Sequence, residues 1–156
     1  MACHLPAREP DSVRSLLLMV CLVFAVPVYA AEPELILACE ISGTEGGYLR
    51  LTQADGKLNY VFSLQSADAP ITAFSVPLSE VAFRSWNNQR QFLSYLLVMR
   101  QGGDVYSVYA SYDNWSGLDA TGVTVERNEV FLAGYGCSRM TVRGDLVAYV
   151  PKHQKK

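Results

Sequence analysis

Histidine is nearly absent from this chain of 156 residues, which contains only His4 and His153. His4 lies in a leader that we expect to be removed, and His153 lies in a basic tail. Serine and cysteine nucleophiles usually need an adjacent imidazole as general base, and a structural zinc needs imidazoles or several thiolates. We therefore expect no catalytic residues, no metal and no cofactor.

Positive charge is scarce as well. The chain has 13 Lys and Arg against 15 Asp and Glu, a net charge of −2, and its locally basic run is confined to residues 152–156. A nucleic-acid-binding domain normally carries a basic patch or stripe. The sequence also lacks a glycine-rich loop followed by Lys and Ser or Thr. Neither nucleic acid nor a nucleotide is an expected ligand.

The first 30 residues have the three parts of a secretory signal peptide. Arg8 and Arg14 precede an apolar run over residues 16–26, and a small-x-small sequence ends at Ala30. We expect cleavage there and a periplasmic or secreted product. A membrane anchor is the rival interpretation, but Pro27 interrupts the run, which is shorter than the roughly 20 residues of a spanning helix. No stable membrane insertion is expected after cleavage.

Cysteine is rare in the remaining part of the chain, which keeps only Cys39 and Cys137. Two cysteines in an exported protein predict one disulfide bond. Closing a loop of roughly 100 residues is worth about 4.7 kcal/mol in the chain-entropy model. The bond would fasten the first strand to a late one. Lipidation of Cys39 is disfavoured, because Glu32 and Glu34 separate it from the apolar run.

Residues 31–150 have the pattern of a single β domain. Apolar and polar residues alternate over 48–53 and 57–65, as in half-buried strands, and a hairpin signal separates them. A second hairpin signal, residues 101–104, is the strongest in the chain. The other expected strands are 35–42, 71–76, 91–100, 105–113, 122–127, 130–135, 140–142 and 146–150.

Roughly 8–10 short strands without a long amphipathic helix predict an all-β, mostly antiparallel fold, either a small barrel or a sandwich. Residues 79–90 are compatible with one short helix or with an extended segment, and both interpretations stay open. Residues 151–156 are expected to form a disordered basic tail.

The segment 106–119 has the composition of a recognition surface, because Tyr and Trp are interleaved with Ser, Gly and Asn. Alternation places Tyr109 opposite the face shared by Tyr106 and Tyr112, and a polar loop is expected over residues 114–121. The alternative is that these aromatics cover an edge of the core. The candidate binding residues are Tyr109, Asp113, Asn114, Trp115 and Asp119.

Other polar groups give weaker signals. Asp113, Asn114 and Asp119 do not have the spacing of a twelve-residue calcium loop. Asn114-Trp115-Ser116 fits a glycosylation sequon, which matters only in a host that glycosylates such sites. A second candidate patch consists of Arg84, Trp86, Asn87, Asn88 and Arg90. The carboxylates that remain available for acid–base chemistry are Glu40, Glu45, Glu80, Asp113, Asp119, Glu126 and Glu129.

By elimination, we expect an exported, non-catalytic binding protein whose partner is another protein. Our first hypothesis is a periplasmic inhibitor or immunity protein that binds a toxic or cell-wall-lytic enzyme. The first alternative is a β-barrel carrier with a cavity of several hundred cubic ångströms for a small ligand. The second is a glycoside hydrolase, which needs two facing carboxyl groups. The oligomeric state is not indicated by the sequence.

Overall fold

The structure is a computed structural model, and it describes residues 32–65, 71–88 and 91–154. The chain divides into two units, Met1–Ala30 and Ala31–Lys156, and every described residue belongs to the second. The predicted signal peptide therefore lies outside the described residues. Within the described part, no helix is long and apolar enough to cross a membrane.

The first sheet is a four-stranded antiparallel meander in the order β1-β2-β3-β4. Asp55 and Gly56 both have positive φ, 50° and 71°, at the turn between the second and third strands. This conformation matches the twist of a two-residue hairpin, which explains the Asp-Gly signal in the sequence. The strands are β1 (Glu34–Glu40), β2 (Tyr48–Ala54), β3 (Lys57–Ser63) and β4 (Thr72–Pro77).

The second sheet has five antiparallel strands in the order β5-β6-β7-β8-β9. Gly102 and Gly103 supply the positive φ angles, 60° and 88°, of the predicted hairpin at residues 101–104. The sequence allowed either a short helix or an extended segment over residues 79–90. The structure has a single 3-10 turn there, η1 (Leu78–Glu80), followed by a strand. The five strands are β5 (Ala82–Asn87), β6 (Phe92–Gln101), β7 (Asp104–Asp113), β8 (Leu118–Arg127) and β9 (Val130–Gly136).

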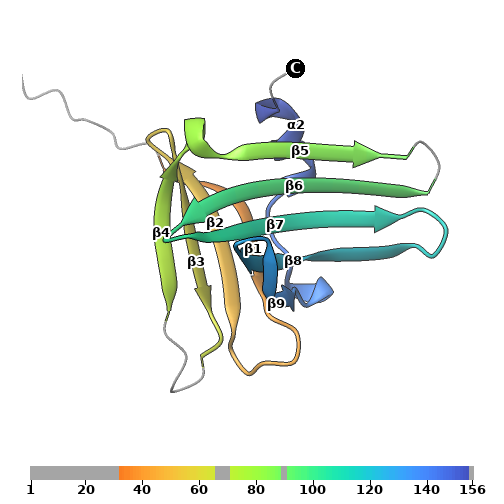
Figure 1. The fold of residues 1–156 in the computed structure, drawn as a ribbon. Coiled ribbons are helices and arrows are strands. Elements are labelled where there is room, and N and C mark those ends of the chain that lie inside the picture. The colour runs from red at the N-terminus through yellow and green to blue at the C-terminus, as the bar shows by residue number, and fades with distance from the viewer. Residues whose placement is uncertain (1–31, 66–70, 89–90, 155–156) are drawn as a thin grey trace, which may run out of the picture. The chain divides into compact units, whose positions relative to one another are not determined.

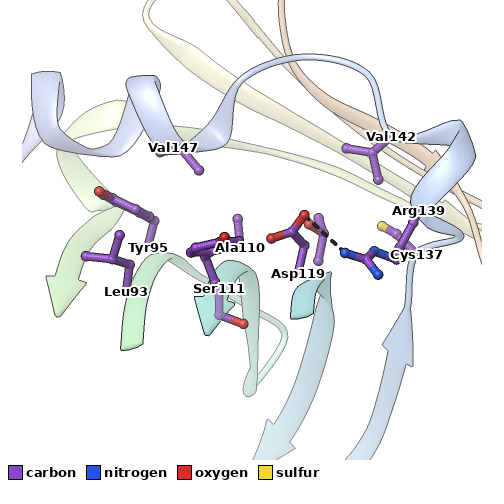
Figure 2. Close-up of a pocket in the computed structure, with 11 residues that line it drawn as sticks. Leu93, Tyr95, Ala110, Ser111, Asp119, Cys137, Arg139, Val142 and Val147 are labelled. Atoms are coloured by element: carbon purple, nitrogen blue, oxygen red, sulfur yellow. Dashed lines mark hydrogen bonds and ion pairs between the residues drawn. The ribbon is translucent and has the colours of Figure 1, made fainter. Parts of the chain in front are cut away.

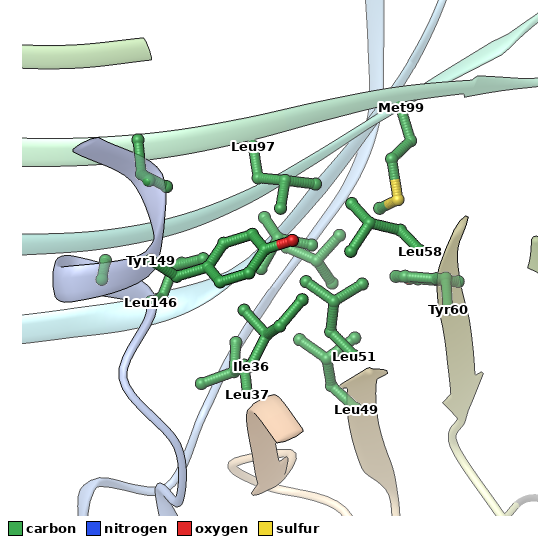
Figure 3. Packing of buried hydrophobic residues seen from close by; sticks show 14 of the residues in the cluster. Ile36, Leu37, Leu49, Leu51, Leu58, Tyr60, Leu97, Met99, Leu146 and Tyr149 are labelled. Carbon is green, nitrogen blue, oxygen red and sulfur yellow. The ribbon is translucent and has the colours of Figure 1, made fainter. Parts of the chain in front are cut away.

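The two sheets pack face to face as a sandwich and do not close into a barrel. Strands β6, β7 and β8 run across the first sheet, and one end of each extends beyond it (Figure 1). Figure 3 shows leucines of β2 and β3 meeting Leu97 and Met99 of β6. Several core residues are 0% exposed, among them Leu49, Leu51, Leu58, Leu97, Met99, Val108 and Val123. The all-β antiparallel fold predicted from the sequence is confirmed.

Among the described residues, one buried side-chain polar atom, the Tyr60 hydroxyl, lacks a hydrogen-bond partner. Tyr60 is 1% exposed, and its hydroxyl makes no hydrogen bond to another described residue. Its ring stacks on Phe74 at 4.8 Å and lies 5.3 Å from the ring of Tyr106. Burial raises the pKa of the Tyr60 hydroxyl, so this group stays neutral.

The chain ends in a helix, α2 (Leu146–His153), where the sequence predicts a strand over 146–150 and a disordered tail from 151. Both predictions are wrong for the described residues. Asp145 caps the helix by accepting a hydrogen bond from the backbone N–H of Ala148 at 2.8 Å. The side chains of Leu146, Tyr149 and Val150 are buried, and this i, i+3, i+4 spacing is that of a helix face.

Pro151 and His153 belong to the same helix. Pro151 lacks an N–H, which removes one bond of the last turn, but burial of the preceding face keeps the segment helical. The ring of His153 stacks on Tyr149 at 4.2 Å and lies 5.3 Å from Phe83. The second histidine is thus packed against aromatic rings. The expected strand at 140–142 is also wrong, since Arg139–Thr141 form a 3-10 turn, η2.

The predicted disulfide bond is confirmed. Cys39 of β1 and Cys137, directly after β9, are joined with their Cα atoms 5.6 Å apart. The bond closes a loop across 98 positions of sequence. Backbone hydrogen bonds flank it, from Ser42 N to Gly136 O and from Ser138 N to Glu40 O. The disulfide therefore fastens the first strand of one sheet to the last strand of the other.

Candidate functional site

The inner face of the five-stranded sheet, which packs on the first sheet, is only half covered. Leu97, Val108 and Val123 lie side by side on β6, β7 and β8 and are fully buried. Side chains alternate between the two faces of a strand, so positions two and four residues further along share this face. These further positions lie at the ends of the strands that extend beyond the first sheet. They are Leu93 and Tyr95, Ala110 and Tyr112, and Asp119 and Thr121.

The C-terminal segment covers this exposed half of the inner face and leaves a cavity of about 440 Å³ beneath it. In Figure 2 the sheet forms one wall, and α2 and the segment before it form the other. Val147 of α2 and Val142 approach from that second wall, and Cys137 of the disulfide lies beside Arg139 at one side of the cavity. The remaining lining residues are Leu93, Tyr95, Ala110, Ser111, Tyr112, Asp119, Thr121 and Arg139.

An ion pair lies at one side of the cavity. Arg139 Nη2 is 3.3 Å from Asp119 Oδ2 and donates a second hydrogen bond of 3.3 Å to the carbonyl of Gly117. Both side chains are 56% exposed, so water screens the pair and it contributes little to stability. Its structural effect is to tie the C-terminal segment to the start of β8. Both groups remain accessible to a polar end of a bound molecule.

The cavity wall contains one carboxylate among its described residues, Asp119, and this group faces an arginine. A glycoside hydrolase needs two carboxyl groups that flank the scissile bond. The geometry of this cavity does not match that requirement. In the described ranges, no group of three or more His, Cys, Asp and Glu side chains is arranged to hold a metal ion.

The five candidate binding residues do not form one surface. Asp119 lies on the inner face and lines the cavity. Tyr109 lies on the outer face of β7, where its ring covers Gly122 so closely that a Cβ there would be 2.8 Å from the hydroxyl. Its position is that of a packed outer-face residue.

Asp113, Asn114 and Trp115 belong to the turn between β7 and β8. Asp113 Oδ1 accepts hydrogen bonds from the backbone N–H of Trp115 at 2.8 Å and of Ser116 at 3.4 Å. The first of these bonds is the main reason that the pKa of Asp113 lies below its usual value. The turn spans residues 114–117 and is shorter than the loop expected at 114–121, because β8 begins at Leu118. Trp115 is 77% exposed, so it does not cover a core edge.

The sequence does not identify most of the cavity residues as binding residues. Alternation correctly places Ala110 and Tyr112 on one face of their strand, but it does not tell which part of that face the other sheet covers. Val142 and Val147 were assigned to strands, which gave no reason to place them over the sheet. The available signal is the length of the strands predicted at 91–100 and 105–113, which form β6 and β7 with ten residues each against six or seven in β1–β4. The ten residues of β8 gave no such signal, because only 122–127 was predicted as a strand.

No known protein family, curated protein or solved structure matches this chain. The functional interpretation therefore depends on the sequence pattern and on the geometry of the site.

Proposed function

We propose that this chain is an exported binding protein that holds a small molecule with an apolar body in the cavity between the five-stranded sheet and the C-terminal segment. The signal-like leader and the single disulfide bond support export. The observation that carries the proposal is the cavity itself. From the sequence alone, the carrier function was only an alternative to the inhibitor function. The cavity supports the carrier function more than the inhibitor function.

The size and lining of the cavity support this assignment. Its volume of about 440 Å³ falls within the roughly 300 to 1,000 Å³ that is usual for small-ligand sites. Leu93, Val142 and Val147 give it apolar walls, while Asp119 and Arg139 stand at one side. Such sites combine mostly apolar surface with a few polar groups that orient the ligand. The ligand therefore has an apolar body and a polar end that meets the ion pair.

A fluorescent apolar probe, N-phenyl-1-naphthylamine, tests the proposal. We expect its emission to rise on titration with the purified, oxidised protein. Val147→Trp places a large ring in the cavity and should weaken binding at least tenfold. The matched control is Ala148→Trp on the same helix, because Ala148 is exposed and does not line the cavity.

The comparison between the two tryptophan variants decides the outcome. Equal probe affinity in Val147→Trp and Ala148→Trp would place binding elsewhere and contradict the proposal. Absence of any emission change with the unmodified protein would contradict it as well.

A protein partner, such as the enzyme expected for an inhibitor or immunity protein, is the second candidate function. It is supported by the edge strand β9, where Val130, Phe131 and Leu132 are 60%, 62% and 51% exposed. An exposed apolar sheet edge is a typical place for another chain to add a strand.

Pull-down of candidate cell-wall hydrolases tests this second candidate. Phe131→Asp should abolish capture, while Trp115→Ala, which changes an exposed aromatic away from β9, should not. Capture that is unaffected by Phe131→Asp would remove the support for this function.

A further inference from the structure

A second hollow lies on the outer face of the five-stranded sheet, at the same end as the cavity. Its volume is about 360 Å³, and it is lined by Asn88, Gln91, Phe92, Asp113 and Trp115. Trp86 adjoins it, with its ring centroid 5.8 Å from that of Phe92. Positions 86 and 92 alternate with the inner-face residues of β5 and β6, so both side chains lie opposite the cavity.

The two tryptophans offer large exposed rings. Trp115 is 77% exposed and Trp86 is 58% exposed, while Phe92 between them is half-buried. Isolated apolar residues on a surface need no explanation, but here Trp86 packs on Phe92, and Phe92 and Trp115 line one hollow. We call Trp86, Phe92 and Trp115 the aromatic platform.

Hydrogen bonds fix the described backbone at Gln91, Phe92 and Trp115. Asn88 Oδ1 accepts hydrogen bonds from the backbone N–H groups of Gln91 at 3.0 Å and Phe92 at 3.1 Å. Asn114 N donates to the carbonyl of Gln91 at 2.8 Å, which ties the turn after β7 to the residue before β6. Asp113 fixes the backbone at Trp115. A prearranged site loses less conformational entropy on binding.

Polar groups stand beside the aromatic rings. The amide nitrogen of Asn88 and the side-chain amide of Gln91 make no hydrogen bond to another described residue. The carboxylate of Asp113 lines the same hollow. An amide both donates and accepts hydrogen bonds, and a carboxylate accepts them. The hollow thus combines flat apolar surface with hydrogen-bonding groups at its side.

We propose that the aromatic platform binds a pyranose ring of a glycan. One face of such a ring carries C–H groups that pack on an indole, and its edge carries hydroxyls that both donate and accept hydrogen bonds. The amides of Asn88 and Gln91 and the carboxylate of Asp113 match that edge. Among the described residues that line the hollow, the charged group is the anion Asp113, so the glycan expected here carries no carboxylate or sulfate groups. The site is separate from the cavity and goes beyond the function proposed for it.

Heteronuclear NMR tests this site directly. The isotope-labelled protein with its disulfide intact is titrated with two neutral probes, the tetramer of N-acetylglucosamine and cellotetraose. We expect at least one of them to shift the indole N–H signals of both tryptophans and the side-chain amide signals of Asn88 and Gln91. Trigalacturonic acid, which carries carboxylates, should bind at least tenfold more weakly.

Three variants define the site. Trp115→Ala should weaken the neutral glycan at least tenfold, and Trp115→Phe, which keeps a flat ring, should recover part of the loss. Tyr112→Ala removes an aromatic ring from the cavity on the opposite face and should leave glycan affinity unchanged.

Several results would overturn the glycan site. These are unchanged spectra with both neutral probes, equal affinity in Trp115→Ala, or equal affinity for the acidic trimer. The proposal would also be overturned if the NMR signals of the aromatic platform shift only when a captured protein binds. The surface would then be a protein contact. None of these results affects probe binding in the cavity, so the two proposals fail separately.

Discussion

At the scale of single residues, one glycine explains how Tyr109 packs on the outer face. Gly122 and Gly136 are paired across β8 and β9, yet their surroundings differ. A Cβ at Gly122 would clash with the carbonyl oxygen of Tyr135 and lie 2.8 Å from the Tyr109 hydroxyl, whereas one at Gly136 would meet nothing within 4 Å. Because Gly122 has no side chain, the hydroxyl end of Tyr109 can occupy the space above this position.

We therefore expect Gly122→Ala to lower the free energy of unfolding by about 1 to 3 kcal/mol, the usual cost of overpacking. Gly136→Ala is the matched control and should change it by less than about 0.5 kcal/mol, as for a substitution away from any tight contact. Urea denaturation of the two variants measures both values. Equal losses in the two variants would contradict the close packing described at Gly122.

Asp113 gives a prediction about pH. Its pKa is lowered mainly by the hydrogen bond from the backbone N–H of Trp115, so the folded state favours the carboxylate. The stabilisation it provides is present above the unfolded pKa of about 3.9 and is lost as the pH falls through the lower folded value. NMR should show the amides of Trp115 and Ser116 titrating with a midpoint below 3.9. A midpoint at or above that value would contradict the turn geometry.

At the scale of elements, strand patterns were predicted well because each depends on local alternation and turn chemistry. The hairpins at Asp55-Gly56 and Gly102-Gly103 follow directly from residues that tolerate positive φ. The C-terminal helix was missed because Leu146–Val150 is short and apolar and Pro151 follows it, features that do not separate a strand from a buried helix turn. Its helical form depends on tertiary burial and on the Asp145 cap.

The cap gives a prediction for α2. Asp145→Ala removes the acceptor of the Ala148 N–H and should destabilise the protein by about 1 kcal/mol, while Asp145→Asn keeps an acceptor and should cost less. Thermal unfolding of both variants checks this order. If the alanine and asparagine variants unfold at the same temperature as the unmodified protein, the cap does not hold the helix.

Strand length contains a signal for the cavity that alternation alone does not give. A ten-residue strand is about 34 Å long, whereas four strands about 4.8 Å apart cover roughly 19 Å. When the sheets cross, as they do here, about half of each long strand must extend beyond the first sheet (Figure 1). The first sheet therefore does not cover the inner face at Leu93, Tyr112 and Asp119, where the cavity lies.

At the scale of the molecule, the disulfide bond and the C-terminal segment act together. Cys39–Cys137 joins the first strand of one sheet to the end of the other, and Cys137 also lines the cavity. From there the chain passes through η2 to α2, whose Tyr149 hydroxyl donates a hydrogen bond to Gln53 on β2. The disulfide and most strands could be predicted from the sequence, but β5 stayed undecided and β8 begins four residues before the predicted strand 122–127.

The cavity could not be predicted, because it depends on how the two sheets cross and on where the last segment packs. Of the residues chosen from the sequence, Asp119 lines this cavity, while Trp115 and Asp113 belong to the separate outer hollow.

The position of a bound apolar probe tests the central claim most directly. With N-phenyl-1-naphthylamine bound, intermolecular nuclear Overhauser effects should connect its rings to the methyl groups of Leu93, Val142 and Val147, which line the cavity. Contacts to the methyl groups of Val130 and Leu132 on the exposed edge strand, in place of the cavity residues, would contradict the account.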